Sequence, residues 1–296
     1  MSFDVEIVLP TRAQIGEGAL WDAARQRLLW IDVANAKVFL YDPATGSNQA
    51  FDTGTQVGTV VLRRQGGTGP AGAAMIATEN GIAELDLSTG RITPWINPEA
   101  GSTINRFNDG KCDPAGRFWV GTMRNDFRLP TANLWCLYPD GHVERKLSDL
   151  TCSNGIVWTS DTRTMYYIDT PTHQVWAFDY DLATGNISNR RTAVEVPHEM
   201  GGPDGMAIDV EDKIWVALWG GGRVVRFDPQ TGKTMLEIPV PGARCVTSCA
   251  FGGAALDELY ITTAAGGTKP AEQPHAGHLL RVRVPVRGAP THAFAG

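Results

Sequence analysis

The sequence predicts an all-β fold, a six-bladed β-propeller with a metal site in its central channel. Three observations lead to this prediction: an internal repeat with a period in the forties, a recurrent hairpin turn, and many turn residues between strands with central aromatics. The 296 residues include 33 Gly and 18 Pro, and no long stretch has a convincing helical period. No Pro-, Ser- or charge-rich linker interrupts the repeat, so residues 1–296 are expected to form one domain.

The repeat is marked by the residue that opens a turn ahead of each strand. These residues are Trp21, Cys112, Trp158, Ile208 and Gly252, at intervals of 91, 46, 50 and 44 residues. The first interval is two periods long, so a sixth repeat is expected near residue 65, with a turn over 65–72 and an apolar strand over 73–77. The strands expected after the other turns span residues 28–31, 117–120, 164–168 and 213–216.

A second recurring feature of the repeat is a hairpin turn that ends in Thr-Gly. It occurs at residues 41–46, 85–90, 180–185 and 227–232, each time with Asp as its second residue. Short strands separated by such turns are typical of four-stranded propeller blades. The first expected strand, residues 5–9, precedes the first repeat. We expect it to pair with residues 279–284, which would close the ring and cover its edges.

Composition excludes several classes of function. The net charge of −6 and the pI near 5.5 favour neither nucleic acid nor an anionic membrane surface. No signal-like N-terminus and no membrane-spanning apolar run is present, so a cytoplasmic location is expected. The five Cys form no CxxC pair and are expected to be reduced thiols. The six His are scattered, which argues against a His-rich zinc site.

The motifs of two other folds, dinucleotide-binding domains and α/β-hydrolases, are not supported. Residues 67–72 match GxGxxG, but residues 73–78 are expected to form a strand where a dinucleotide site needs a helix. We therefore interpret this segment as a turn of a blade. The sequence also lacks a G-x-S-x-G nucleophile elbow, so it does not favour an α/β-hydrolase.

Four oxygen-bearing residues share one phase of the repeat. Glu17, Asn108, Asn154 and Asp204 each stand four places before a turn-opening residue. Equivalent positions of a radial repeat converge on one axis, and two carboxylates with two amides suit a hard cation. The alternative is that the Asn-Gly and Asp-Gly pairs are ordinary turn dipeptides and that Glu17 lies on the surface. Three further acids that follow the repeat turns are expected to bind turn amides, namely Asp22, Asp113 and Asp209.

Across nearly its whole length, the chain resembles the gluconolactonase/regucalcin family, also called the senescence marker protein family. Its most specific motif is Asn105-Arg-Phe-Asn-Asp-Gly-Lys111, followed by Asp113-Pro-Ala-Gly-Arg117. The resemblance implies a six-bladed propeller with one divalent metal in the central channel. The other segments that match are Gly16-Glu17-Gly18 with Trp21, Gly121-Thr-Met123, Ser153-Asn154-Gly155 and Pro203-Asp204-Gly205.

The same resemblance assigns roles to single residues. It implies that Glu17, Asn154 and Asp204 are the metal ligands and that Arg106 and Asn108 hold the substrate. In close animal relatives an acidic residue after the Gly-Thr-Met turn also touches substrate. Here Asp126, one methylene shorter, takes that place, which leaves the choice of sugar open.

These residues together predict a sugar lactonase. Three protein ligands leave open positions on a cation that takes about six to eight oxygens, so a lactone carbonyl can bind there. Asp204 or the metal would activate water, while Arg106 and Asn108 orient the ring. Ca²⁺, Mg²⁺, Mn²⁺ and Zn²⁺ are all candidate cofactors. The loop over residues 264–277 is expected to cap the channel mouth.

Two other functions remain open on sequence grounds. A calcium-binding protein that acts through partner contact would use the same three ligands but has no need of Arg106 and Asn108. A metal-dependent phosphotriesterase or other esterase on this fold would need an apolar pocket. The expected partner is a small-molecule sugar lactone.

Overall fold

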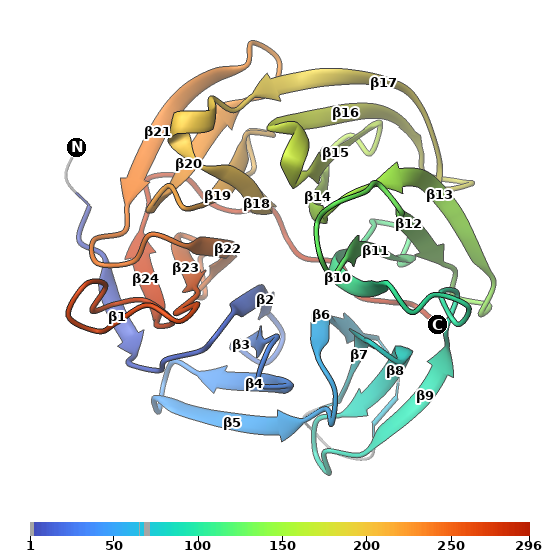
Figure 1. Ribbon diagram of the computed structural model, residues 1–296, viewed down its shortest axis with the longest axis horizontal. Helices are drawn as coiled ribbons and strands as arrows, with labels where there is room; N and C mark the ends of the chain where they lie inside the picture. Colours follow the sequence, from blue (N-terminus) through green and yellow to red (C-terminus); the bar gives the residue numbers. More distant parts are fainter. Residues whose placement is uncertain (1–2, 65, 68–71) are drawn as a thin grey trace.

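The structure, a computed structural model, describes residues 3–64, 66–67 and 72–296. Its strands form six four-stranded antiparallel sheets, arranged as the blades of a ring (Figure 1). The described residues contain no α-helix, only the 3-10 turns η1 (Thr170–Thr172) and η2 (His198–Met200). The six-bladed all-β fold expected from the repeat is therefore confirmed. That residues 1–296 are a single domain stays a prediction.

Each blade runs from an innermost strand near the axis to an outermost strand at the rim. The first three blades are β2 (Gly16–Asp22), β3 (Arg27–Asp32), β4 (Lys37–Asp42), β5 (Ser47–Asp52); β6 (Val57–Arg63), β7 (Ala73–Thr78), β8 (Gly81–Asp86), β9 (Ile92–Ile96); and β10 (Asn105–Cys112), β11 (Phe118–Arg124), β12 (Ala132–Leu137), β13 (Val143–Leu150).

The other three blades complete the ring, and the last of them combines both ends of the chain. They are β14 (Ser153–Trp158), β15 (Thr164–Asp169), β16 (Gln174–Asp181), β17 (Asn186–Glu195); β18 (Gly202–Ile208), β19 (Ile214–Trp219), β20 (Arg223–Asp228), β21 (Lys233–Pro239); and β22 (Val246–Gly252), β23 (Glu258–Thr263), β24 (Leu279–Arg283), β1 (Glu6–Leu9).

The expected closure of the ring is confirmed. Strand β1 pairs antiparallel with β24, with Glu6 opposite Arg281 and Ile7 opposite Leu280. Pairing the first strand with the last element of the same sheet leaves the N-terminal strand as the outermost strand of the sixth blade (Figure 1). This contact holds the ring closed, because it joins segments from opposite ends of the described chain.

The hydrophobic core is divided among the blade interfaces. Six clusters of buried side chains each join two neighbouring sheets. As a result, an inner strand is buried on both faces. In β3, successive side chains point to opposite faces, yet all four of its central residues are buried: Leu28, Leu29, Trp30 and Ile31. The outermost strand β17, which reads Asn-Ile-Ser-Asn-Arg-Arg, is mostly exposed. Inner strands are thus continuously apolar because sheets cover both of their faces.

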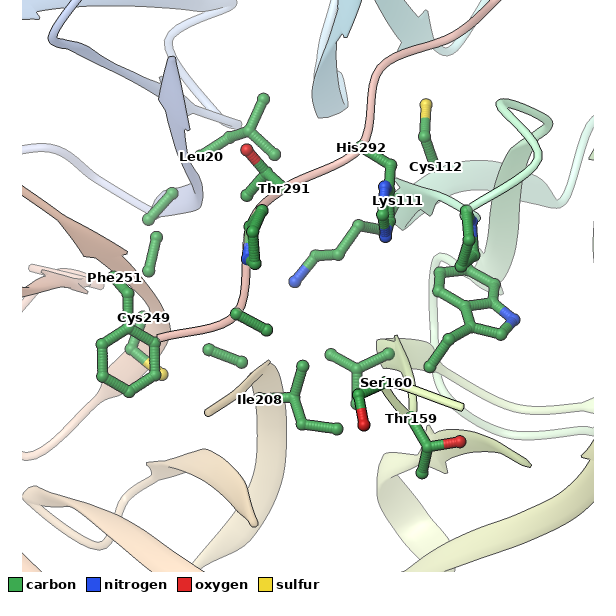
Figure 2. Close-up of a pocket in the computed structure, with 18 of the residues that line it drawn as sticks. Leu20, Lys111, Cys112, Thr159, Ser160, Ile208, Cys249, Phe251, Thr291 and His292 are labelled. Atoms are coloured by element: carbon green, nitrogen blue, oxygen red, sulfur yellow. The ribbon is translucent and has the colours of Figure 1, made fainter. Parts of the chain in front are cut away.

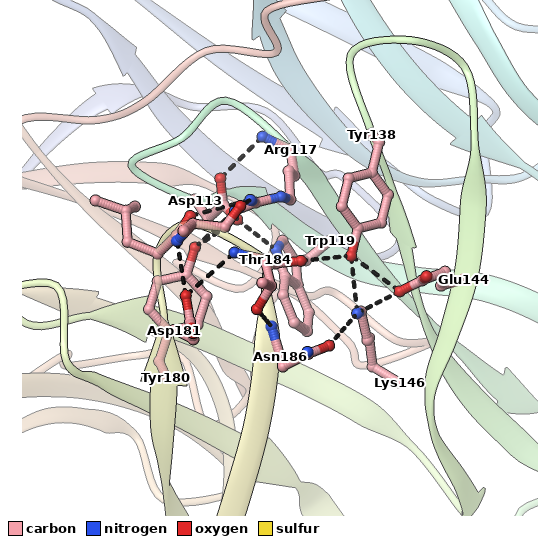
Figure 3. A network of polar contacts seen from close by, with 12 residues as sticks. Asp113, Arg117, Trp119, Tyr138, Glu144, Lys146, Tyr180, Asp181, Thr184 and Asn186 are labelled. Atoms are coloured by element: carbon pink, nitrogen blue, oxygen red, sulfur yellow. Dashed lines mark hydrogen bonds and ion pairs between the residues drawn. The ribbon is translucent and has the colours of Figure 1, made fainter.

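The aspartates that follow the repeat turns bind turn amides, as expected. Oδ1 of Asp113 accepts the backbone N–H of Arg117 at 2.8 Å. Its Oδ2 accepts Trp119 Nε1 at 2.9 Å and the Tyr180 hydroxyl at 2.7 Å, so it also ties two blades together (Figure 3). Asp209 binds Trp215 Nε1 at 2.9 Å in the same way, and Asp22 accepts the amides of residues 24 and 25.

The recurrent hairpin turns are also confirmed. In the first of them, the N–H of Gly46 donates to the carbonyl of Asp42 at 2.8 Å, and Gly46 has a φ of +73°. Such a φ belongs to the left-handed region, where a side chain is unfavourable, which explains why each of these turns ends in glycine. The turns join the third strand of a blade to its outermost strand.

The last residues of the chain, 288–296, cross one end of the ring and are called the C-terminal segment below. Ala289 donates its N–H to Ile208 O at 3.0 Å, and Phe294 donates to Leu62 O at 2.8 Å. The Phe294 ring is fully buried between β6–β9 and β10–β13. The segment therefore links blades that lie on opposite sides of the axis.

Other expectations have mixed outcomes. The strand expected over residues 73–77 is β7, but the GxGxxG turn before it lies mostly outside the described residues. All five cysteines are free. No helix in the described ranges is long and apolar enough to cross a bilayer. A cytoplasmic location stays a prediction.

Candidate functional site

Every innermost strand bulges at the same level of the ring. The register with the second strand shifts between Glu17 and Leu20, Val57 and Thr59, Phe107 and Gly110, Asn154 and Ile156, Pro203 and Met206, and Val246 and Ser248. A bulge leaves one residue without a ladder partner and redirects its side chain. All four residues of the shared repeat phase lie at such bulges, which brings their side chains toward the axis.

Close packing around the axis explains the glycine after each of two site residues. A Cβ on Gly205 would stand 2.6 Å from Ser248 Oγ, and one on Gly155 would stand 2.6 Å from Met206 Cβ. Neither glycine has a positive φ. The Asn-Gly and Asp-Gly pairs are therefore not turn dipeptides. They lie within the innermost strands, where the neighbouring blade leaves no room for a side chain.

Glu17 and Asp204 form a pair of carboxyl groups beside the axis. Asp204 is buried, and its carboxyl group hydrogen-bonds that of Glu17. Burial, with the negative Asp109 nearby, raises the pKa of Glu17 to about 8. Burial also raises the pKa of Asp204 well above its usual range, with Glu17 and Asp109 adding to the shift. Both shifts act in the direction that favours a shared proton over two charged carboxylates when no cation is bound.

A chain of hydrogen bonds fixes the two amides. Arg106 donates to Asn108 Oδ1 at 3.0 Å, and Asn108 Nδ2 donates to Asn154 Oδ1 at 3.0 Å. The Asn154 amide nitrogen donates in turn to Thr170 Oγ1 at 2.7 Å. This orientation points the Asn154 oxygen away from Thr170, and an amide oxygen has a second lone pair for another partner.

Arg106 has the properties of a ligand-binding guanidinium. Its recorded hydrogen bonds go to two neutral oxygens, Phe107 O at 2.9 Å and Asn108 Oδ1. It makes no ion pair within 4 Å among the residues that the structure describes, although it is half-buried. A guanidinium has five N–H donors, so several remain for a polar ligand.

The residues present suit a divalent cation. Two buried carboxyl groups in contact, with raised pKa values, are unfavourable unless a proton or a positive ion lies between them. Over the described ranges, no three His, Cys, Asp or Glu side chains form a ligand cluster, so a third protein ligand would be another oxygen donor, and the Asn154 amide is the candidate. An all-oxygen donor set is the kind that Ca²⁺, Mg²⁺ and Mn²⁺ prefer.

Asp126 is placed differently from the other site candidates. Its loop follows β11, and Arg124 at the end of β11 pairs with Asn105 at the start of β10, so the loop emerges at the same end of the ring as Arg106. However, Arg124 binds its half-exposed carboxylate. Within the part of the chain that the structure describes, no hydrogen bond or ion pair joins Asp126 to the other candidates. Its contact with substrate stays a prediction.

Two residues of the site were not identified from the sequence. Thr170 holds the Asn154 amide from the 3-10 turn after β15, outside the repeat phase, and its hydroxyl donates to Pro203 O at 2.8 Å. Asp109 lies in the bulge of β10, where burial raises its pKa and Lys111 opposes the shift. The sequence signal for Asp109 was its place directly after Asn108, but Asp-Gly suggested a turn.

The loop over residues 264–277 lies at the same end of the ring as Glu17. It leaves β23 at Thr263, whose carbonyl stands beside Gly16. Ala265 donates its N–H to Ala13 O, and Ala13 donates to Gly277 O, both at 3.0 Å. These bonds dock the loop on the segment before β2. Its action as a cap stays a prediction.

Fold and site together define a class: six-bladed β-propellers with a buried cluster of carboxyl and amide groups at one end of the central channel. The chain belongs to the SMP-30/Gluconolactonase/LRE-like family, whose model matches residues 15–265. The resemblance inferred from the sequence motifs is thereby confirmed.

Individual relatives match over nearly the full length. Regucalcin of Danio rerio is 40% identical over 303 residues, which cover 100% of this chain and 99% of the relative. A solved luciferin-regenerating enzyme is 31% identical, with a TM-score of 0.91 and full coverage of both chains. A solved protein of Agrobacterium tumefaciens, described as a calcium-binding protein, regucalcin, has a TM-score of 0.92 at 24% identity, covering 99% and 98% of the two chains.

Proposed function

We propose that this protein hydrolyses a sugar lactone to the aldonic acid with the help of one divalent cation. The observation on which the proposal rests is that two groups are linked: Arg106 acts electrostatically on Glu17, and Thr170 joins Asn154 to Pro203, the residue before Asp204. The Glu17–Asp204 pair suits a cation, and the hydrogen-bonded Arg106 and Asn108 suit the oxygens of a sugar ring. Membership of a family named in part for gluconolactonase supports a hydrolase.

Glu17, Asn154 and Asp204 would hold the cation. When bound, it supplies a Lewis acid that polarises the lactone carbonyl and stabilises the negative charge that develops on its oxygen. Arg106 and Asn108 bind hydroxyls and ring oxygens of the substrate and hold the carbonyl in place. Asp126 is proposed as a further contact at the mouth of the channel.

The proton transfers are assigned to Asp204. Its carboxylate takes a proton from the attacking water as the water oxygen bonds to the carbonyl carbon. The ring C–O bond then breaks, and the ring oxygen receives that proton, which yields the hydroxy acid. Cys152 is near both amides, but burial raises the pKa of its thiol far above its usual value, so it is unsuited to act as a nucleophile.

The proposal is tested by following acid release from glucono-, galactono-, xylono- and arabinono-lactones, with a phosphotriester as the comparison. Saturable hydrolysis of at least one lactone, and little of the phosphotriester, is the expected result. A protein that binds Ca²⁺ but hydrolyses no lactone would instead act as a calcium-binding protein. A preference for the phosphotriester would support the esterase alternative.

Removing the cation is expected to abolish lactone hydrolysis. Without it, Glu17 and Asp204 favour a shared proton and the carbonyl is not polarised. Chelation followed by elemental analysis should show loss of about one bound ion together with activity, and adding back Ca²⁺, Mg²⁺, Mn²⁺ or Zn²⁺ should restore both. The melting temperature should also fall on chelation, because a ligand that binds only the folded state stabilises it. Full activity of metal-free protein would contradict the proposal.

Replacing Asn108 by alanine is expected to raise KM about tenfold with a small effect on kcat, because it removes contacts made equally in the ground and transition states. Since Asn108 also binds Asn154, cation affinity should weaken slightly. Asn186→Ala, on the exposed outer strand β17, is the matched control and should change neither constant. A loss confined to kcat in Asn108→Ala would show that Asn108 acts in the chemical step instead.

A further inference from the structure

A second chamber lies at the other end of the central channel. Four of its wall residues follow Glu17, Asn108, Asn154 and Asp204 by three positions on the same strands. They are Leu20, Lys111, Val157 and Ala207. Three residues of extended strand span at most about 10 Å, and the bulges in these strands shorten the distance between the two sites. Its volume is about 260 Å³, enough for a small organic molecule.

A small cavity adjoins the chamber, with Ala19, Leu20 and Lys111 in the walls of both. It lies beside Thr59, Asp109 and Ser248 and measures only about 10 Å³. That is room for roughly one water molecule. Neither cavity is lined by Glu17, Asn108, Asn154 or Asp204, so a ligand of the chamber would contact other residues than a lactone at the cation site.

The C-terminal segment forms part of the wall of the chamber. Residues 289–292 line it, and Figure 2 shows this segment passing beside the pocket with Thr291 and His292. Thr291 Oγ1 donates to Trp21 O at 2.8 Å, which fixes the segment to the first blade. The chamber reaches the surface beside Ser160, an exposed residue of the turn between β14 and β15.

Lys111 carries the only charge that points into this chamber among the labelled residues of Figure 2. Its Nζ donates to Met206 O at 2.7 Å, and an ammonium group has two further N–H donors. No carboxylate lies within 4 Å of it over the described ranges, although Asp109 and Glu17 attract it from farther away. Burial lowers the pKa of Lys111, which reflects the unfavourable surroundings of the charge.

The remaining walls are mainly apolar. Leu20, Ile208 and Phe251 line the chamber into which the Lys111 amine points (Figure 2). A single ammonium group in an apolar chamber matches a monoanion with an apolar body. The polar wall residues besides Lys111 are Thr159, Ser160, Thr162, Thr291 and His292, and the hydroxyls of Thr159, Ser160 and Thr291 already donate to protein oxygens. A phosphate or a free sugar acid would therefore leave more of its oxygens without donors here than a monocarboxylate would.

We propose that the second chamber binds a small aliphatic monocarboxylate, with the carboxylate on Lys111 and the chain against Leu20, Ile208 and Phe251. The ligand pairs with the buried ammonium group and fills apolar space that water occupies poorly. This site does not depend on lactone hydrolysis at the other end of the channel.

Calorimetric titration with hexanoate tests the proposal, with hexanamide as the uncharged analogue. Hexanoate should bind saturably with one site, and hexanamide at least about tenfold more weakly, as expected for loss of a charge-assisted hydrogen bond. Lys111→Met, which keeps a chain of similar length, should weaken hexanoate by a similar factor. Lys269→Met, on an exposed loop lysine, is the matched control and should bind like the unchanged protein.

Two further variants separate this site from the cation site and from effects on folding. Asp204→Ala removes a proposed cation ligand and should leave hexanoate affinity unchanged, whereas a carboxylate bound to the cation would be lost. Ala289→Leu fills the chamber from the C-terminal segment without altering charge, and should weaken hexanoate even if Lys111→Met fails to fold. The proposal is overturned if hexanoate does not bind, if Lys111→Met and Ala289→Leu bind it normally, or if only Asp204→Ala abolishes binding.

Discussion

Replacing Asp204 by alanine is expected to lower kcat for lactone hydrolysis by about 100-fold or more, the effect typical of losing a general acid–base group. The change removes both a proposed cation ligand and the group that takes the proton from water. Asp204→Asn separates the two roles, because it keeps an oxygen donor but cannot accept that proton at neutral pH. It should retain more of the bound cation than Asp204→Ala yet be similarly slow.

Three measurements on these variants belong together: kinetics, cation content and circular dichroism. The fold should survive, because Asp204 faces the channel and not a blade interface. In the cation-free state, Asp204→Ala should be at least as stable as the unchanged protein, since its buried carboxyl group is unfavourable beside Glu17. Asp179→Ala, on an exposed strand position, is the control for loss of a carboxylate. Near-normal turnover by Asp204→Ala would refute the mechanism and favour a non-catalytic calcium-binding protein.

Replacing Asp113 by alanine should destabilise the fold more than most single substitutions. It would remove the acceptor of four hydrogen bonds, which come from Trp119 Nε1, the Tyr180 hydroxyl, and the backbone and guanidinium N–H groups of Arg117 (Figure 3). Removing one partner of a buried charged pair lowers the free energy of unfolding by about 3–5 kcal/mol. The melting temperature should therefore fall by on the order of 10 °C.

The repeat supplies the matched control for this prediction. Asp22 occupies the equivalent position of the first blade, but its partners are the amides of residues 24 and 25 and the partly exposed side chain of Arg25. By strand register, Leu29 is the equivalent of Trp119, so the first blade has no indole N–H at the position that binds Asp113 in the third blade. Asp22→Ala should therefore lower the unfolding free energy by only about 1 kcal/mol. If both variants lost the same unfolding free energy, the links that Asp113 makes between blades would contribute nothing to stability.

The sequence predicted the architecture well because the propeller repeats one unit. The period placed β3, β11, β15 and β19 close to their observed positions, and the Asp-x-x-Thr-Gly pattern predicted the outer hairpins. Shared phase also indicated which side chains would lie near the axis. Equivalent residues of repeated blades must face the same way, so this inference could be made without knowing any side-chain contact.

The glycines beside the site residues show where local reasoning fails. The alternative to a shared site was that Asn154-Gly155 and Asp204-Gly205 are ordinary turns, because Gly is common where φ is positive. Here both glycines are needed because the neighbouring blade approaches closely. That approach is set by residues about fifty positions away, which a local pattern does not report.

The sequence by itself therefore determined the number of blades, the closure of the ring by its two ends, and the oxygen-rich character of the site. Only the tertiary structure decided which hydrogen bonds and charges surround the site residues. Thr170 orients Asn154 from another strand end, Asp109 acts as a nearby negative charge on Glu17 and Asp204, and the chamber at Lys111 is lined by other residues than the cation site. Periodicity fixes which residues face the axis, whereas hydrogen-bond partners and open space depend on how six blades meet around it.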